Sequence, residues 1–275
     1  MIALVTDSTA YFTKRESEQW GVRVVPMSYT VGGRIFHETY WDKNGDYETL
    51  LREFISQART SQSSVSAFMS AFDELIRQGY DVLCITISSR LSGTYSSATV
   101  AARELGKGRV EVLDSRLTAG GMYMLVKQAR RLIDAGKTLP EIMDELIRAR
   151  DSISIAFSVS DLTQLRKSGR LGVIRQSVST ILNNKPLFLC AEGTVVSDGM
   201  ARGHADQMQR LLKRVPPGSP EIVVHYTRQE ERAAKAMLNS LVQSHPGANI
   251  LCRVLGPVLT IHLGLSVLGI AFRQA

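Results

Sequence analysis

Residues 81–95, DVLCITISSRLSGTY, join a solidly apolar run to a dense cluster of hydroxyl side chains. The run Asp81 to Ile87 has the length and the β-branched content of a strand that is buried on both faces. It leads directly into the hydroxyl-rich residues 88–94, and a helical pattern follows from Tyr95 to Leu105. A buried strand that ends in polar residues before a helix is typical of a parallel α/β sheet, in which ligands bind outside the carboxyl ends of the strands.

The same alternation of apolar runs and helical periods extends in both directions from this stretch. Before residue 152 we expect further strands at 2–6, 22–31 and 110–113 and helices at 46–57, 66–78, 118–135 and 139–150. Gly32-Gly33 indicates a turn, and residues 59–64 are interpreted as a linker between two helices.

The pattern changes after Asp151, where the expected strands become shorter and more irregular. They lie at 154–159, 186–190, 194–197, 221–226 and 250–254, with long helices near 203–214 and 228–244. The sequence therefore predicts an α/β protein of two domains. Residues 1–152 would form a Rossmann-like domain with a parallel sheet, and residues 153–275 a second α/β domain.

The composition of the 275 residues, with 44% hydrophobic and 21% charged side chains, is that of a globular protein. The start, residues 1–7, lacks the basic leader of a signal peptide, and no apolar run reaches the roughly 18 residues of a membrane span. Cys84, Cys190 and Cys252 each stand in an apolar run without paired spacing, which argues against a disulfide framework and a zinc site. We expect a soluble protein in a reducing cytoplasm.

The net charge of +7 is spread along the chain, and its tightest group is Arg166, Lys167, Arg170 and Arg175. Proteins that bind nucleic acids usually concentrate basic residues in a stripe beside stacking aromatic residues. A dispersed, solvated surface is the simplest interpretation, and a local docking patch for an anionic partner is the alternative. A basic module that binds nucleic acid is a weaker hypothesis.

Hydroxyl side chains gather at three expected strand-to-helix junctions, residues 7–9, 60–64 and 88–94. The free N–H groups and partial positive charge of a helix N-terminus suit an anion there. N-capping is the simpler explanation of any single hydroxyl, but one cap per helix does not require so many of them between residues 88 and 94.

Common catalytic and nucleotide-binding motifs are missing from the sequence. Ser92-Gly93 follows Leu91, so it is not a G-x-S-x-G elbow, and there is neither a P-loop nor a G-x-G-x-x-G after the first strand. The histidines are scattered without metal-ligand spacing. A serine–histidine pair without a third orienting carboxylate stays open.

Nine short segments carry a resemblance over nearly the whole chain. In order they are DSTA (7–10), TSQ (60–62), ISSRLSGTY (87–95), LDS (113–115), FSV (157–159), LRKSGRLG (165–172), NKP (184–186), GPV (256–258) and HLG (262–264). No single segment is diagnostic, but the ordered set resembles the DegV family. The resemblance implies a two-domain fold with a ligand tunnel between the domains.

For function, the resemblance implies a cytoplasmic protein that binds a long-chain, palmitate-like fatty acid, with no other cofactor, no metal and no catalytic residue. Such carriers present the acid to the catalytic subunit of a fatty-acid kinase, which forms an acyl phosphate for phospholipid synthesis. A transient contact with a membrane surface fits this role, whereas binding to nucleic acid does not.

The family's site residues carry over to positions of this sequence. Thr60 and Ser92 match the hydroxyls that hold the carboxylate, and His262 matches a histidine beside it. Ser61 and Gly93 would flank the head group. The residues that match basic positions for kinase docking are Arg170 and Arg202. The tunnel walls should come from apolar residues of both halves. The candidates are Phe157, Ile174, Ile181, Leu263 and Leu268, and each fits the plain core equally well.

The chain departs from the family pattern at two places. Ser63 follows Thr-Ser-Gln where many relatives have proline, and Leu265-Ser266 replaces a small, proline-containing stretch. These departures leave the preferred acyl chain open. The enzyme alternative is a hydrolase or acyltransferase that uses Ser92 with His262.

Overall fold

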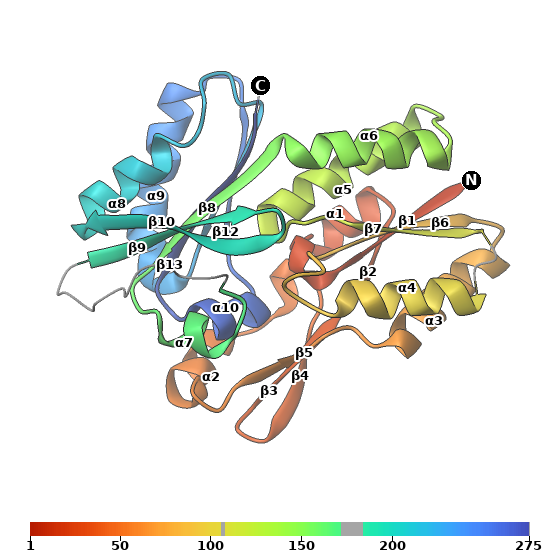
Figure 1. The fold of residues 1–275 in the computed structure, drawn as a ribbon, viewed down its shortest axis with the longest axis horizontal. Coiled ribbons are helices and arrows are strands. Elements are labelled where there is room, and N and C mark those ends of the chain that lie inside the picture. Colours follow the sequence, from red (N-terminus) through yellow and green to blue (C-terminus); the bar gives the residue numbers. More distant parts are fainter. Residues whose placement is uncertain (106–107, 172–183, 275) are drawn as a thin grey trace.

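The computed structural model of the chain describes residues 1–105, 108–171 and 184–274, and their strands form three sheets (Figure 1). The first sheet is parallel, with strand order β2-β1-β6-β7. Its strands are β1 (Ile2–Asp7), β2 (Val22–Val25), β6 (Asp81–Thr86) and β7 (Val110–Asp114). The predicted α/β class with a parallel N-terminal sheet is confirmed.

Helices cover both faces of the parallel sheet, as the apolar runs require. Side chains alternate along a strand, so Leu4 packs into one cluster and its neighbour Val5 into another. The cluster of Val5 includes residues of α3 (Val65–Arg77) and α4 (Thr94–Leu105). That of Leu4 includes residues of α5 (Ala119–Asp134) and α6 (Leu139–Asp151). The short helix α1 (Lys14–Gln19) precedes β2.

The second sheet is mixed and has strand order β10-β9-β8-β13-β11-β12. Its strands are β8 (Ile153–Val159), β9 (Asn184–Ala191), β10 (Thr194–Arg202), β11 (Glu221–Tyr226), β12 (Asn249–Val254) and β13 (Val267–Arg273). Only the β11–β12 pairing in it is parallel.

Helix α5 lies between the parallel sheet and the mixed sheet (Figure 1). Its residues share a cluster with Leu83 of β6 on one side and with Val223 and Ala271 of β11 and β13 on the other. The opposite face of the mixed sheet packs on α8 (Gly203–Leu212) and α9 (Glu231–Ser244). One helix therefore belongs to the cores of both halves, and the domain boundary at residue 152 stays a prediction.

The third sheet is a small antiparallel one below the other two in Figure 1, with strand order β4-β3-β5. It consists of β3 (Met27–Val31), β4 (Arg34–Glu38) and β5 (Arg59–Ser61). Its apolar side chains pack with α2 (Tyr47–Phe54) and with α10 (Pro257–Leu263) from the far end of the chain. Helix α7 (Thr163–Lys167) lies against α10.

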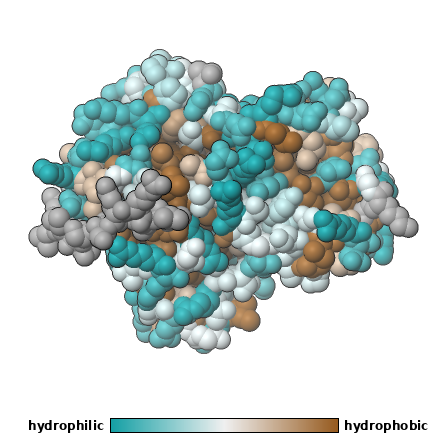
Figure 2. All heavy atoms as spheres, in the orientation of Figure 1, coloured by the Kyte–Doolittle hydropathy of each residue, from teal (hydrophilic) through white to brown (hydrophobic). Residues whose placement is uncertain are grey.

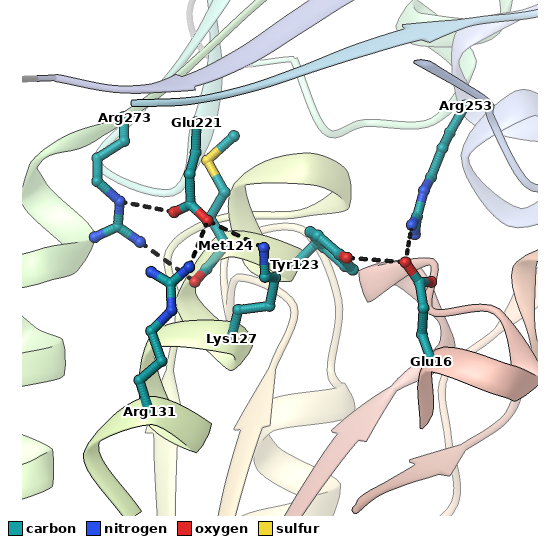
Figure 3. Close-up of polar contacts among 8 residues, drawn as sticks. All are labelled: Glu16, Tyr123, Met124, Lys127, Arg131, Glu221, Arg253 and Arg273. Atoms are coloured by element: carbon teal, nitrogen blue, oxygen red, sulfur yellow. Dashed lines mark hydrogen bonds and ion pairs between the residues drawn. The ribbon is translucent and has the colours of Figure 1, made fainter. Parts of the chain in front are cut away.

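Two ion clusters connect elements from the two halves of the chain. Figure 3 shows Glu221 of β11 facing Lys127 and Arg131 of α5 and Arg273 of β13. Burial alone would raise the pKa of Glu221, but Lys127 and the two arginines hold it below its usual range. In the second cluster Arg253 of β12 pairs with Glu16 of α1.

Three predicted details are wrong. Residues 22–31 are not one strand, because β2 and β3 belong to different sheets and Pro26 between them cannot donate a ladder hydrogen bond. The predicted linker 59–64 contains the strand β5. The strands after Asp151 are not shorter, because β8, β9 and β10 have 7, 8 and 9 residues.

Hydrophilic and intermediate residues cover most of the face shown in Figure 2, and hydrophobic residues reach it in patches between them. Among the helices of the described residues, none is long and apolar enough to cross a membrane.

Candidate functional site

A cavity of about 390 Å³ lies where the parallel sheet, the small antiparallel sheet and the mixed sheet meet. Its volume is in the range of small-molecule sites. The walls are predominantly apolar and include Ile87, Leu91, Phe157, Leu165, Leu255, Leu259, Leu263 and Val267. They come from both halves of the chain, so the cavity exists only when the two halves are packed together.

One end of this cavity is polar. Thr60 Oγ1 lies 2.7 Å from His262 Nε2. Thr60 is placed by β5, where it is opposite Tyr29 of β3, and His262 lies in the last turn of α10. The first turn of α10 is held by Glu38, whose carboxylate accepts from the Val258 N–H at 2.9 Å.

His262 is a neutral imidazole at pH 7. Burial lowers its pKa, and the positive charge of nearby Arg170 lowers it further, to about 4. A neutral imidazole has one donor and one acceptor nitrogen. The end of the cavity at Thr60 and His262 can therefore donate hydrogen bonds to an anion while Arg170 supplies positive charge.

Ser92 and Gly93 reach the cavity from the loop between β6 and α4. Ser92 Oγ is 2.9 Å from Thr94 Oγ1, and it accepts from the Thr94 N–H at 3.3 Å. A Cβ on Gly93 would lie 2.0 Å from Gln62 Oε1. The Gln62 side chain occupies that space and donates to Ser97 Oγ at 2.8 Å. Gly93 thus lets the loops 60–62 and 92–94 approach each other.

A second hollow, of about 410 Å³, adjoins this polar end. It shares Thr60, Arg170 and His262 with the inner cavity and adds the basic side chains of Arg59 and Lys167. The two hollows thus meet at the same three residues, and the outer one is bordered by three positive charges.

The hydroxyls at residues 7–9 serve the fold. Asp7 Oδ1 accepts from Thr9 N–H and Oγ1, Asp7 Oδ2 accepts from Ile87 N–H at 2.7 Å, and burial raises the pKa of this carboxyl group. Ser8 Oγ donates to Glu38 Oε1 at 3.0 Å. At this junction the Asp7 carboxyl group caps the turn Ser8–Ala10, whereas the two hydroxyls donate to carboxyl groups and do not cap.

The predicted ligand-binding positions are brought together, since Thr60, Ser61, Ser92, Gly93 and His262 all border the cavity. Their predicted roles stay predictions. Of the predicted docking residues, Arg170 borders both hollows. Arg202 is exposed at the N-cap position of α8, where its side chain makes no capping hydrogen bond, and it borders neither hollow.

Some of the residues proposed as tunnel walls border the cavity and others do not. Phe157 and Leu263 border the cavity. Leu268 instead is fully buried in the core between β13 and the helices α8 and α9. Ile174 and Ile181 lie outside the described residues.

The residues at both departures from the family pattern form hydrogen bonds within the fold. Ser63 Oγ, where relatives have proline, donates to the Pro26 carbonyl oxygen at 2.9 Å, which fixes the chain between β2 and β3. The Leu265 carbonyl oxygen accepts from Thr227 Oγ1 at 2.7 Å. Ser266 Oγ interacts with Ser160 Oγ at 2.5 Å and with Glu230.

Among the unpredicted residues that border the cavity, three have polar side chains with nitrogen or oxygen atoms: Gln62, Thr118 and His225. His225 was detectable in principle, because it interrupts the otherwise apolar run of β11. In the described parts of the chain there is no group of three or more His, Cys, Asp or Glu side chains that could hold a metal ion.

The fold and the sequence agree with one family. A protein-family sequence model described as "Uncharacterised protein, DegV family" matches residues 1–275. A DegV domain-containing protein of Deinococcus radiodurans is 30% identical over 278 residues, which cover 98% of this chain and 97% of that protein.

Solved structures of DegV proteins superpose on nearly the whole chain. A DegV family protein from Thermus thermophilus, described with its fatty-acid binding, has a TM-score of 0.86 and 31% identity and covers 100% of this chain and 99% of its own. DegV from Bacillus subtilis, described as a fatty-acid-binding protein, has a TM-score of 0.86 and 26% identity with the same coverage. The chain belongs to the DegV family.

Proposed function

We propose that this chain binds one long-chain fatty acid in the inner cavity and presents its carboxylate to a separate fatty-acid kinase. The observation that carries the proposal is the contact between Thr60 and His262 at the polar end of a mainly apolar cavity. The fatty-acid binding of the relatives from Thermus thermophilus and Bacillus subtilis supports it.

The tail and the head group of the acid have different tasks. Burial contributes about 0.8 kcal/mol for each CH₂, so a palmitate-like chain gains on the order of 12 kcal/mol before the costs of association. A hydrogen bond to a charged group adds only about 1.5–3 kcal/mol. The apolar walls thus provide the affinity, and Thr60, Ser92 and His262 set the orientation and depth of the acid.

The outer hollow supports presentation to a second protein. A carboxylate bound at Thr60 and His262 would border this hollow, and Arg59, Lys167 and Arg170 there would attract the phosphates of ATP bound to a kinase partner. We propose that Arg170 and Arg202 belong to the docking surface of the kinase. A transient contact with a membrane surface during lipid uptake remains part of the proposal.

The geometry favours a carrier over the hydrolase alternative. His262 Nε2 contacts Thr60, and Ser92 Oγ contacts Thr94, so the pair that would activate Ser92 is not formed. A fluorophosphonate probe distinguishes the two functions, because a carrier stays unlabelled and a nucleophilic Ser92 reacts.

The head-group assignment is tested by native mass spectrometry of the protein purified from cells. The double variant Thr60→Ala/Ser92→Ala should keep its melting temperature and lose a hundredfold or more in fatty-acid affinity, because it lacks two hydrogen bonds to a charged group. Ser96→Ala is the control, since Ser96 is exposed in α4, four residues after Ser92, and does not border the cavity. Full lipid retention by the double variant would refute the assignment.

The kinase role needs its own measurement. With a fatty-acid kinase and ATP, Arg202→Ala should slow the phosphorylation of the bound acid and leave the lipid content unchanged, because Arg202 does not border the cavity. An unchanged phosphorylation rate would remove Arg202 from the docking surface.

A further inference from the structure

The inner cavity is bordered by a buried histidine that the fold does not use. His225 of β11 is 5% exposed, and neither its Nδ1 nor its Nε2 makes a hydrogen bond within the described residues. Buried polar groups are nearly always hydrogen-bonded, and each exception needs an explanation. His225 is therefore a polar group of this cavity whose two nitrogens the described part of the fold leaves without a well-formed hydrogen bond.

The protonation state of His225 defines what it can bind. Burial lowers its pKa, and the charge of Arg253 lowers it further, to about 3. A polar contact between the ring and the Arg253 backbone opposes this shift in part, but it does not have the geometry of a hydrogen bond. At neutral pH the ring is uncharged, with one nitrogen that donates and one that accepts. A carboxylate only accepts hydrogen bonds and so can bind only the N–H side of such a ring, whereas a hydroxyl group can bind either nitrogen.

The surroundings of His225 keep the ring in its place. A Cβ on Gly120 of α5 would lie 2.8 Å from His225 Nε2, so only glycine leaves room for the ring there. Gly269 stands opposite His225 in the β11–β13 ladder and also borders the cavity. On the far side the ring of Tyr11 lies at a centroid distance of 5.8 Å.

A second unused polar group lies near this ring. Thr118 precedes Gly120 by two residues and occupies the N-cap position of α5, yet its side chain makes no capping hydrogen bond. Its Oγ1 is buried without a partner in the described part of the chain, and Thr118 borders the same cavity. The fold thus leaves two polar groups without a partner along one apolar cavity.

These two groups are separate from the head-group end. Thr60, Arg170 and His262 border both hollows, whereas Thr118 and His225 border only the inner one. An acid whose carboxylate lies at Thr60 and His262 would extend its tail into the inner cavity, which His225 and Thr118 also border.

We propose that the fatty acid held by this chain carries an oxygen substituent on its tail, a hydroxyl or keto group, which hydrogen-bonds to His225 and Thr118. This inference depends on the proposed fatty-acid binding and specifies its ligand class. A hydroxyl group both donates and accepts, so it can bind one ring nitrogen in either tautomer and use its other hydrogen-bonding capacity on Thr118 Oγ1.

The test is a competition between stearic acid and a series of monohydroxystearic acids with the hydroxyl at successive carbons, followed by native mass spectrometry. Because His225 is fixed in the fold, one isomer, or two adjacent ones, should bind about two- to tenfold more tightly than stearic acid, the usual worth of one hydrogen bond. His225→Leu and Thr118→Val should each reduce this preference while stearic acid still binds. His225→Gln, which keeps a donor and an acceptor, should retain part of it.

The outcomes separate this inference from the proposed function. Equal binding of all isomers and stearic acid, with only an ordered water at His225, would overturn the inference and leave fatty-acid binding intact. A preference that persists in both His225→Leu and Thr118→Val would also overturn it. If stearic acid and every isomer fail to bind, the proposed function fails and the inference with it. Should His225→Leu not fold, Thr118→Val decides.

Discussion

The close packing of α5 against the mixed sheet makes a sharp prediction about two adjacent glycines. A Cβ on Gly120 would lie 2.7 Å from Val223 Cβ and 3.1 Å from Ala271 Cβ, and neither atom can rotate away, because each is attached directly to a strand backbone. A Cβ on Gly121 would lie 2.8 Å from Ile155 Cδ1, the flexible end of a side chain. Only the first substitution forces the helix and the sheet apart.

Both glycines are in the first turn of α5, so an alanine at either position gains the same helix propensity, at most about 1 kcal/mol. Overpacking costs about 1–3 kcal/mol where the neighbours cannot yield. We therefore expect the free energy of unfolding of Gly120→Ala to be about 2 kcal/mol lower than that of Gly121→Ala. For a chain of this size the difference corresponds to a gap of roughly 4–8 °C in melting temperature.

Thermal and urea unfolding followed by circular dichroism measure this gap, with Gly121→Ala as the matched control. A lower lipid content of Gly120→Ala at a temperature where it is folded would add a functional readout, since His225 would be displaced as well. If the two variants melt within a degree of each other, the space between α5 and the mixed sheet does not constrain the fold as argued.

Three further changes have defined outcomes. Gly93→Ala should displace Gln62 from its hydrogen bond to Ser97 and markedly slow the exchange of bound fatty acid. The free energy of unfolding should fall by only about 0.5–1.5 kcal/mol, and a large drop in melting temperature would contradict this. Glu221→Ala should cost about 3–5 kcal/mol in urea unfolding, because Lys127, 4% exposed, loses its buried partner; a cost below 1 kcal/mol would refute it. Burial raises the pKa of Glu38 from 4.5 to about 7, so between these pH values the folded state keeps a proton that the unfolded state has lost. The free energy of unfolding therefore falls by on the order of 3 kcal/mol as the pH rises from about 4.5 to 7. If the stability of Glu38→Gln depends on pH in parallel with that of the parent protein, this contribution is excluded.

The sequence predicts the parallel sheet well, because the signal for it is local. The run 81–87 is apolar enough for burial on both faces, and the hydroxyls of 60–62 and 88–94 stand out against ordinary caps. Thr60 and His262, which are 202 positions apart, are in contact in the structure. Periodicity alone does not reveal such a contact, and the family resemblance supplied that pair.

The remaining features depend on which element packs on which, and the local pattern does not contain this information. Residues 22–31 form one continuous β-prone run, yet at Pro26 the chain leaves the parallel sheet and enters the small antiparallel sheet. Leu268 and Phe157 have similar sequence surroundings in their strands, but Leu268 points to α8 and α9 while Phe157 points into the cavity. For the same reason the sequence does not distinguish His225 from the other scattered histidines. Its position becomes apparent only in the fold, where Gly120 of α5 packs against its ring. The polar groups that would distinguish one fatty acid from another are therefore the ones that sequence patterns identify least readily.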